Sequence, residues 1–88
     1  MHALVISVTV HDREAATQNL RENIVPRVSQ TPGFVAGYWT AIGPGVGRAM
    51  IVFESEEAAR GLEGELRASA GELVSFDSVD VGEVIAHA

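Results

Sequence analysis

The chain has 88 residues, no cysteine and a formal net charge of −6, and all six of its basic side chains are arginine. The arginines are dispersed rather than clustered, which disfavours nucleic acid as a partner, and the lack of cysteine excludes disulfides, thiolate metal sites and cysteine nucleophiles. A chain of this length forms one small domain, 1–88, with a marginal core, so we expect it to oligomerise.

The first residues, MHALVISVTV, predict a strand from Ala3 to Val10 that is largely buried on both faces, because Val, Ile and Thr dominate it. They lack the basic segment of a signal peptide, and no run approaches the roughly 20 apolar residues of a membrane span. We therefore expect a cytoplasmic protein with no membrane partner.

A helix is expected after Asp12, whose carboxylate can cap the free amides of the first turn. Apolar residues at four-residue spacing predict a side that faces a sheet, and charged residues predict a side that faces water. The apolar set is Ala16, Leu20, Ile24 and Val28, and the charged set is Arg13, Glu14, Arg21 and Glu22. Pro26 predicts a kink or break near Ile24, with the helical path ending before Pro32.

Two strands follow, Phe34 to Ile42 and Val46 to Ser55, joined by the glycine-rich hairpin GPGVG. Ser55 is expected to cap a second helix that begins with acidic residues and ends at Gly71. The apolar stripe of this helix is Ala59, Leu62, Leu66 and Ala70. A last strand is expected from Leu73 to Ile85.

This order of elements predicts an α+β, ferredoxin-like βαββαβ fold. Its four strands form one antiparallel sheet with the first and third strands at the centre, and both helices cover the same face. The other face carries Val, Ile and Met side chains, which is too apolar a surface for a monomer to expose. We therefore expect a homodimer in which two sheets pack face to face.

The segments TPGFVAGYWT and MIVFESEEAARGL resemble those of the dimeric α/β-barrel superfamily, and within it the small antibiotic biosynthesis monooxygenase-like proteins. The resemblance implies the same sheet-to-sheet dimer, with a ligand pocket between the sheet and the helices of each subunit. It also implies several activities: some members oxidise phenols to quinones without metal or flavin, some degrade haem, some isomerise lactones, and others have no known activity.

The resemblance disfavours haem degradation here. Haem-degrading relatives use an iron-ligating histidine on the second helix and an asparagine on the first strand, and this chain has neither. The quinone-forming relatives imply a Trp, a Tyr and an Arg, for which Trp39, Tyr38 and Arg48 are the candidate catalytic residues. We expect no cofactor and no metal, because the three histidines show no metal-ligand spacing.

The hairpin decides which side each aromatic residue faces. If Ile42 pairs with Val46, then Trp39 lies opposite Ala49, and Tyr38 lies on the other face of the sheet. The Trp39 face carries no charge, so we assign it to the helices and the Tyr38 face to the dimer interface. That uncharged face consists of Val35, Gly37, Trp39, Ala41, Gly47, Ala49, Ile51 and Phe53.

The ligand pocket is then predicted to consist of Trp39, Ala49, Ile51, Phe53, Leu20 and Ile24. In one interpretation the small neighbours of Trp39 leave a cavity in which the indole stacks on a flat aromatic ligand. In the other they only make room for the indole, and a lone Trp is more often core than ligand platform. Arg48 likewise either holds an anionic or phenolate ligand or pairs with an acid across the dimer interface.

The sequence thus predicts a small-ligand-binding dimeric α/β-barrel protein that resembles cofactor-independent monooxygenases acting on aromatic or phenolic compounds. The alternative is a non-catalytic ligand-binding or interaction module, because the predicted pocket contains no strong acid or base pair.

Overall fold

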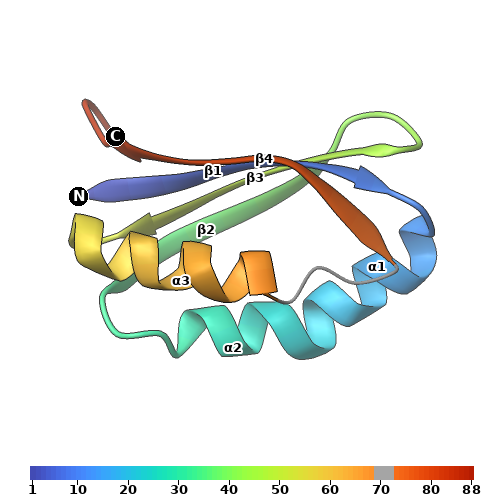
Figure 1. Ribbon diagram of the computed structural model, residues 1–88, viewed down its shortest axis with the longest axis horizontal. Helices are drawn as coiled ribbons and strands as arrows, with labels where there is room; N and C mark the ends of the chain where they lie inside the picture. Colours follow the sequence, from blue (N-terminus) through green and yellow to red (C-terminus); the bar gives the residue numbers. More distant parts are fainter. Residues whose placement is uncertain (69–72) are drawn as a thin grey trace.

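The computed structural model describes residues 1–68 and 73–88 and contains the predicted order of strands and helices (Figure 1). The elements are β1 (His2–Val10), α1 (Arg13–Asn19), the π-helical segment η1 (Leu20–Ile24), α2 (Val25–Ser29), β2 (Phe34–Ala41), β3 (Val46–Phe53), α3 (Glu56–Ala68) and β4 (Val74–Glu83). The strands form one antiparallel sheet in the order β2-β3-β1-β4, so β1 and β3 are central, as predicted. The helices cover one face of this sheet, which confirms the ferredoxin-like fold (Figure 1).

Both predicted helix caps are present. Asp12 Oδ1 accepts a hydrogen bond from the amide of Ala15 at 3.1 Å, and Ser55 Oγ accepts one from the amide of Ala58 at 3.2 Å. Each of these oxygens satisfies an amide that has no acceptor within its own helix. The predicted end of the second helix at Gly71 lies outside the described residues.

Pro26 distorts the first helical path without ending it. The chain is π-helical over η1, where the amide of Val25 donates to the carbonyl of Leu20, and α-helix resumes from Val25 to Ser29. Because Pro26 has no amide hydrogen for the carbonyl of Glu22, one α-helical hydrogen bond is missing at this point, and a π-bulge is a common response to such a gap. The irregularity predicted near Ile24 is therefore confirmed as a widened turn.

The β2–β3 hairpin has the predicted register. The amide of Ile42 donates to the carbonyl of Val46 at 2.9 Å, and Trp39 pairs with Ala49. Trp39 packs against the core on the helix side, whereas Tyr38 is 68% exposed on the other side. The assignment of the two aromatic residues to opposite faces is confirmed.

The pairing departs from the prediction at the start of β2. Phe34 pairs with Phe53 and Ala36 pairs with Val52, so Val35 is an extra residue in a β-bulge. The prediction that Val35 shares the Trp39 face is wrong, because the bulge resets the alternation and leaves this side chain exposed. Phe34 instead faces the core, where its ring meets that of Phe53 edge-on with the centroids 6.2 Å apart.

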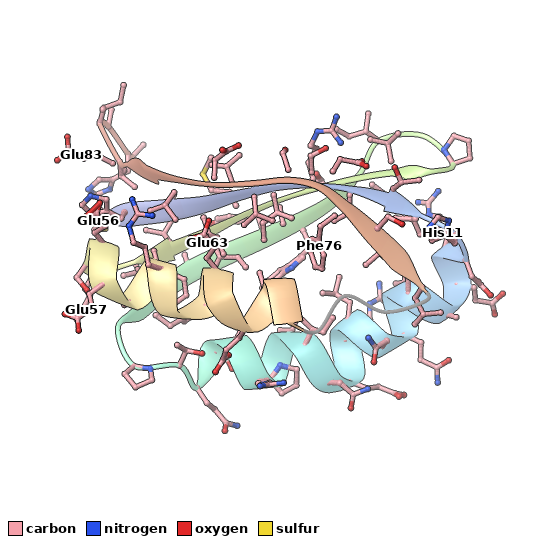
Figure 2. All side chains as sticks on the ribbon, in the orientation of Figure 1. His11, Glu56, Glu57, Glu63, Phe76 and Glu83 are labelled. Atoms are coloured by element: carbon pink, nitrogen blue, oxygen red, sulfur yellow. The ribbon has the colours of Figure 1, made fainter. Side chains whose placement is uncertain are left out.

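The core lies between the sheet and the helices. Its buried side chains come from three strands and both helical regions, namely Leu4, Ile6, Ile51, Phe53, Val79, Val28, Ala59 and Leu62. Figure 2 shows Phe76 of β4 in this layer, while Glu57 at the start of α3 points away from it. Within the described residues, no helix combines the length and apolar character needed to cross a membrane.

The open face of the sheet exposes a row of apolar side chains. Val5, Met50 and Tyr38 pair across three neighbouring strands and are 42%, 47% and 68% exposed. The prediction that β1 is largely buried on both faces is therefore wrong for the single protomer, because nothing in the described chain covers this side of Val5. Contiguous exposed apolar side chains are typical of an interaction surface.

We expect this row to be buried between two copies of the chain. Met50→Asp should give a monomer or an aggregate, because a buried unpaired charge destabilises an interface by about 3–5 kcal/mol. Sedimentation velocity at micromolar concentration measures the outcome, and Gln30→Asp, at an exposed helix end, is the charge-matched control. A wild type that sediments only as a 9.3 kDa species would contradict the expectation.

The indole of Trp39 lies directly over Gly37. A Cβ at Gly37 would lie 2.8 Å from Trp39 Cη2 and 2.9 Å from Cζ3, so Gly37→Ala should destabilise the fold by about 1–3 kcal/mol. Gly61→Ala is the control, because a Cβ there has no neighbour within 4 Å and alanine favours a helix by up to about 1 kcal/mol. Urea unfolding followed by circular dichroism should show opposite signs for the two variants, and equal effects would disprove the packing role of Gly37.

Candidate functional site

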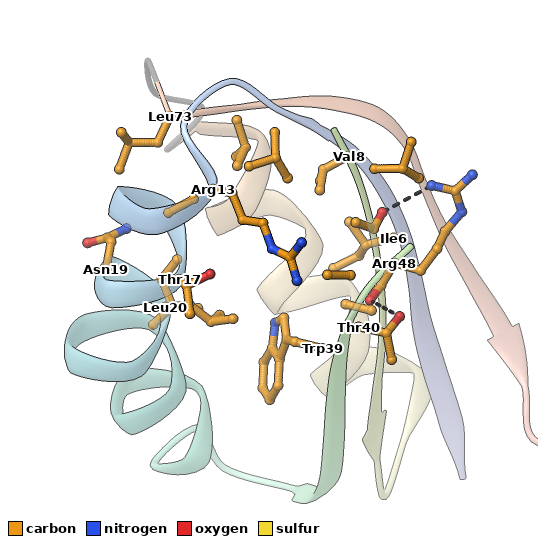
Figure 3. Close-up of a pocket in the computed structure, with 18 of the residues that line it drawn as sticks. Ile6, Val8, Arg13, Thr17, Asn19, Leu20, Trp39, Thr40, Arg48 and Leu73 are labelled. Carbon is orange, nitrogen blue, oxygen red and sulfur yellow. Dashed lines mark hydrogen bonds between the residues drawn. The ribbon is translucent and has the colours of Figure 1, made fainter. Parts of the chain in front are cut away.

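A cavity of about 380 Å³ lies between the first helical path and the helix-facing side of the sheet (Figure 3). All four strands contribute to its walls, which are mostly apolar and include Ile6, Val8, Trp39, Ala49, Ile51 and Phe76. Pockets that hold small organic ligands have volumes of about 300–1,000 Å³, so this cavity suits a compact ligand of a few fused rings.

The indole of Trp39 forms part of one wall. The side chain is half-buried, and its Nε1–H has no hydrogen-bond partner among the described residues. The close approach to Gly37 supports the packing interpretation, whereas the cavity beside the ring leaves part of the indole without protein contacts. Trp39 therefore has both a packed side and a side that a ligand can reach.

Most of the predicted pocket residues line the cavity, namely Trp39, Ala49, Ile51, Leu20 and Ile24. Phe53 does not line it, because this side chain is fully buried in the core against Phe34. Strand alternation predicted the correct face of the sheet for Phe53, but it does not say how far along the strand the cavity extends. It lies four residues from Ala49, which corresponds to about 13 Å in a β-strand.

The three predicted catalytic residues do not come together in the protomer. Tyr38 projects from the open face of the sheet, away from the cavity. Arg48 belongs to a part of β3 that borders the cavity, but Figure 3 shows its guanidinium on the far side of the sheet from Trp39. There its Nη1 donates a hydrogen bond to the carbonyl of Gly47 at 3.1 Å.

Three polar residues that were not predicted as site residues, Arg13, Thr17 and Asn19, line the cavity from α1. The prediction that Arg13 and Arg21 face water is incomplete, because both exposed residues also border the cavity. The signal was present in the sequence: Arg13, Thr17, Leu20 and Ile24 follow at intervals of four, three and four residues, which places them on one helix face.

The charge on the described cavity wall is entirely positive. No Asp, Glu or His is among the described residues that line it, although the chain has twelve acidic residues. This distribution leaves the described part of the wall without a carboxylate or imidazole that acts as a general base. It also leaves no carboxylate there to repel a negatively charged ligand.

The histidines form no comparable site. Across residues 1–68 and 73–88, no group of three or more His, Asp or Glu side chains is placed to hold a metal ion. His11 Nε2 lies 2.7 Å from Ser75 Oγ on the exposed surface, at the end of β1. The helix α3 contains no histidine that would ligate a haem iron.

The sequence matches no protein-family model and no curated protein. The structure is similar to MupZ from Pseudomonas fluorescens, with 17% identity and a TM-score of 0.71 over 91% of this chain, which spans 65% of the MupZ chain. It is also similar to the haem-degrading MhuD from Mycobacterium tuberculosis with two haems bound, with 20% identity, a TM-score of 0.59 and 98% of each chain covered.

A third similar structure is the monooxygenase from the gene ActVA-Orf6 of Streptomyces coelicolor in complex with nanaomycin D. The identity is 15% and the TM-score 0.60, with 98% of this chain and 92% of that chain covered. Similarity at these identities establishes the fold and not the activity. The chain thus shares the ferredoxin-like βαββαβ fold of these solved structures, as the sequence predicted.

Proposed function

We propose that this protein binds a flat, largely apolar aromatic molecule in the cavity beside Trp39 and acts on it as cofactor-independent monooxygenases act on phenols. The observation that carries the proposal is a cavity of about 380 Å³ with aliphatic walls and an indole that is only partly packed. A flat ligand there would bury apolar surface and stack on the indole. Solved structures with this fold hold nanaomycin D in one case and haem in another, which supports a small-molecule ligand for a protein of this fold.

In such a reaction an ionised phenol is oxidised to a quinone by O₂ itself: one oxygen atom becomes the second quinone oxygen, and the other leaves as water with the two hydrogens that the phenol loses. The protein contributes by excluding water and by orienting the phenol, which requires a shaped and preorganised cavity rather than a cofactor. Trp39 is the proposed orienting residue. Tyr38 and Arg48 face the other way, and their proposed role is in the dimer interface.

The alternative is a ligand-binding module without catalytic activity. The absence of Asp, Glu and His from the described cavity wall favours this alternative, because no side chain there takes a proton from a phenol. Oxygen consumption and quinone absorbance after addition of an anthrone separate the two functions, since a binding module produces neither signal above the uncatalysed rate.

We also propose that the protein is a cytoplasmic homodimer. Because Trp39 and the exposed row of Val5, Met50 and Tyr38 lie on opposite faces of the sheet, the proposed interface does not cover the cavities. Each subunit would then offer its own cavity to a ligand.

Trp39→Ala should destabilise the fold by less than about 3 kcal/mol, because removing a fully packed indole costs about 3–5 kcal/mol and the cavity leaves part of this indole without protein contacts. Urea unfolding followed by circular dichroism gives the value. Fluorescence titration of the wild type with anthrone-like and naphthol-like compounds should show saturable quenching by at least one compound, which should also raise the melting temperature.

Free N-acetyltryptophanamide is the control for the titration, because collisional quenching does not saturate and affects the free indole equally. A loss above about 3 kcal/mol in Trp39→Ala, together with no saturable quenching by any compound, would identify Trp39 as a packing residue only.

The purified protein should carry neither haem nor a stoichiometric metal. The physical reason is that α3 offers no histidine to iron and the described residues form no metal-binding cluster. Elemental analysis and an absorption spectrum in the Soret region check this expectation. A Soret band or an equimolar metal would contradict it and would direct attention to the histidines.

A further inference from the structure

Arg13 places a positive charge in the cavity near the point where β1 leads into α1. Figure 3 shows its guanidinium pointing into the space between α1 and the sheet, toward the indole of Trp39. The residue is exposed, so the charge lies where the cavity meets solvent. A guanidinium stays ionised at any physiological pH and donates several hydrogen bonds in fixed directions.

No acid in the described part of the chain neutralises this charge. Within residues 1–68 and 73–88, the side chain of Arg13 makes no ion pair or hydrogen bond, whereas Arg27, by comparison, lies 3.8 Å from Glu65. The adjacent acid, Asp12, already accepts a hydrogen bond from the amide of Ala15 as the helix cap. Among the described residues, the guanidinium therefore has hydrogen-bond donors without an acceptor, and they face the cavity.

The polar groups nearest to this end of the cavity also donate hydrogen bonds. The indole N–H of Trp39 has no acceptor among the described residues, and Thr17 brings a hydroxyl to the same wall one turn after Arg13 (Figure 3). Most of the other lining residues are apolar, and the remaining polar ones are Asn19, Arg21, Thr40 and Arg48. The described cavity is thus complementary to a ligand with an aromatic body and one negatively charged group.

The net charge of −6 opposes the approach of an anion, but its effect is weaker than that of Arg13. At physiological ionic strength, exposed charges more than about 8 Å away are largely screened. A charged group in direct contact with the guanidinium lies well within this distance, so its interaction with Arg13 is screened much less. The local cation therefore dominates the selection of ligands inside the cavity.

We infer that the ligand carries an anionic group, either a carboxylate or an ionised phenol, and that Arg13 binds this group while the aromatic body lies against Trp39. The inference rests on the proposed ligand cavity, and it adds the charge of the ligand and the residue that selects it. A hydrogen bond between two ionised groups raises the affinity for the ligand by about tenfold to hundredfold.

Two matched pairs of probes test the inference. Naphthalene-2-carboxylate is compared with naphthalene-2-carboxamide, and 4-nitrophenolate is compared with the neutral 4-nitroanisole. Binding is followed by the indole N–H signal in NMR spectra, because Trp39 is the only tryptophan and gives a single resonance. The variants are Arg13→Gln and the charge-matched control Arg60→Gln, which changes an exposed residue of α3 that pairs with Glu56.

In the wild type, at least one anion should bind tenfold or more tightly than its neutral partner, and the pair that shows the preference distinguishes a carboxylate ligand from a phenolate. Arg13→Gln should lose the preference and keep its affinity for the neutral probe, whereas Arg60→Gln should behave as the wild type. The comparison of the anionic with the neutral probe in the wild type still tests the inference if a variant folds poorly.

Neutral probes that bind as tightly as both anions would overturn the role of Arg13 and leave the proposed cavity ligand intact. A preference for the anion that survives in Arg13→Gln would do the same. If no probe of either pair shifts the indole signal, the proposed cavity ligand is itself contradicted, and the inference about its charge is overturned with it.

Discussion

The register of the β2–β3 hairpin is the constraint on which the rest of the structure depends. Side chains alternate along a strand, so a slip of one residue would exchange the faces of Trp39 and Tyr38. The turn holds the register, because the amide of Ile42 bonds the carbonyl of Val46 at 2.9 Å and Gly43 adopts a φ of +77°. The apolar row on the open face and the cavity on the helix side both follow from this pairing.

The small size of the residues around Trp39 has a different physical reason at each position. Gly37 is small because the indole lies over it, and Gly47 is small because a Cβ there would lie 2.8 Å from Val8 Cγ2 on the neighbouring strand. Both glycines are thus explained by close packing within the sheet. The cavity lies above them, between the sheet and the helical path that contains η1, so the packing and ligand interpretations of Trp39 are compatible.

The elements of the fold were predictable from local signals, because caps such as Asp12 and Ser55 act within one turn of the chain. The two β-bulges were not predictable in this way. Val35 and Asp77 are extra residues whose positions depend on which residues of a neighbouring strand lie opposite them, and no local pattern contains that information. Asp77 Oδ2 accepts a hydrogen bond from the hydroxyl of Thr9, a contact across 68 residues of sequence.

The site was harder to predict than the fold because charge and helix periodicity gave conflicting signals at Arg13. Its charge predicted a position facing water, whereas its spacing from Leu20 and Ile24 predicted a position facing the sheet. A long side chain can meet both conditions, because its aliphatic part lies along an apolar wall while its charged end reaches solvent. This placement bears on catalysis as well as binding. With no carboxylate or imidazole on the described wall, a cation that favours the ionised form of a phenol would take over part of the role of a base in the proposed reaction. A binding module and an oxygen-dependent enzyme built on this cavity would then differ mainly in whether the bound anion reacts with O₂.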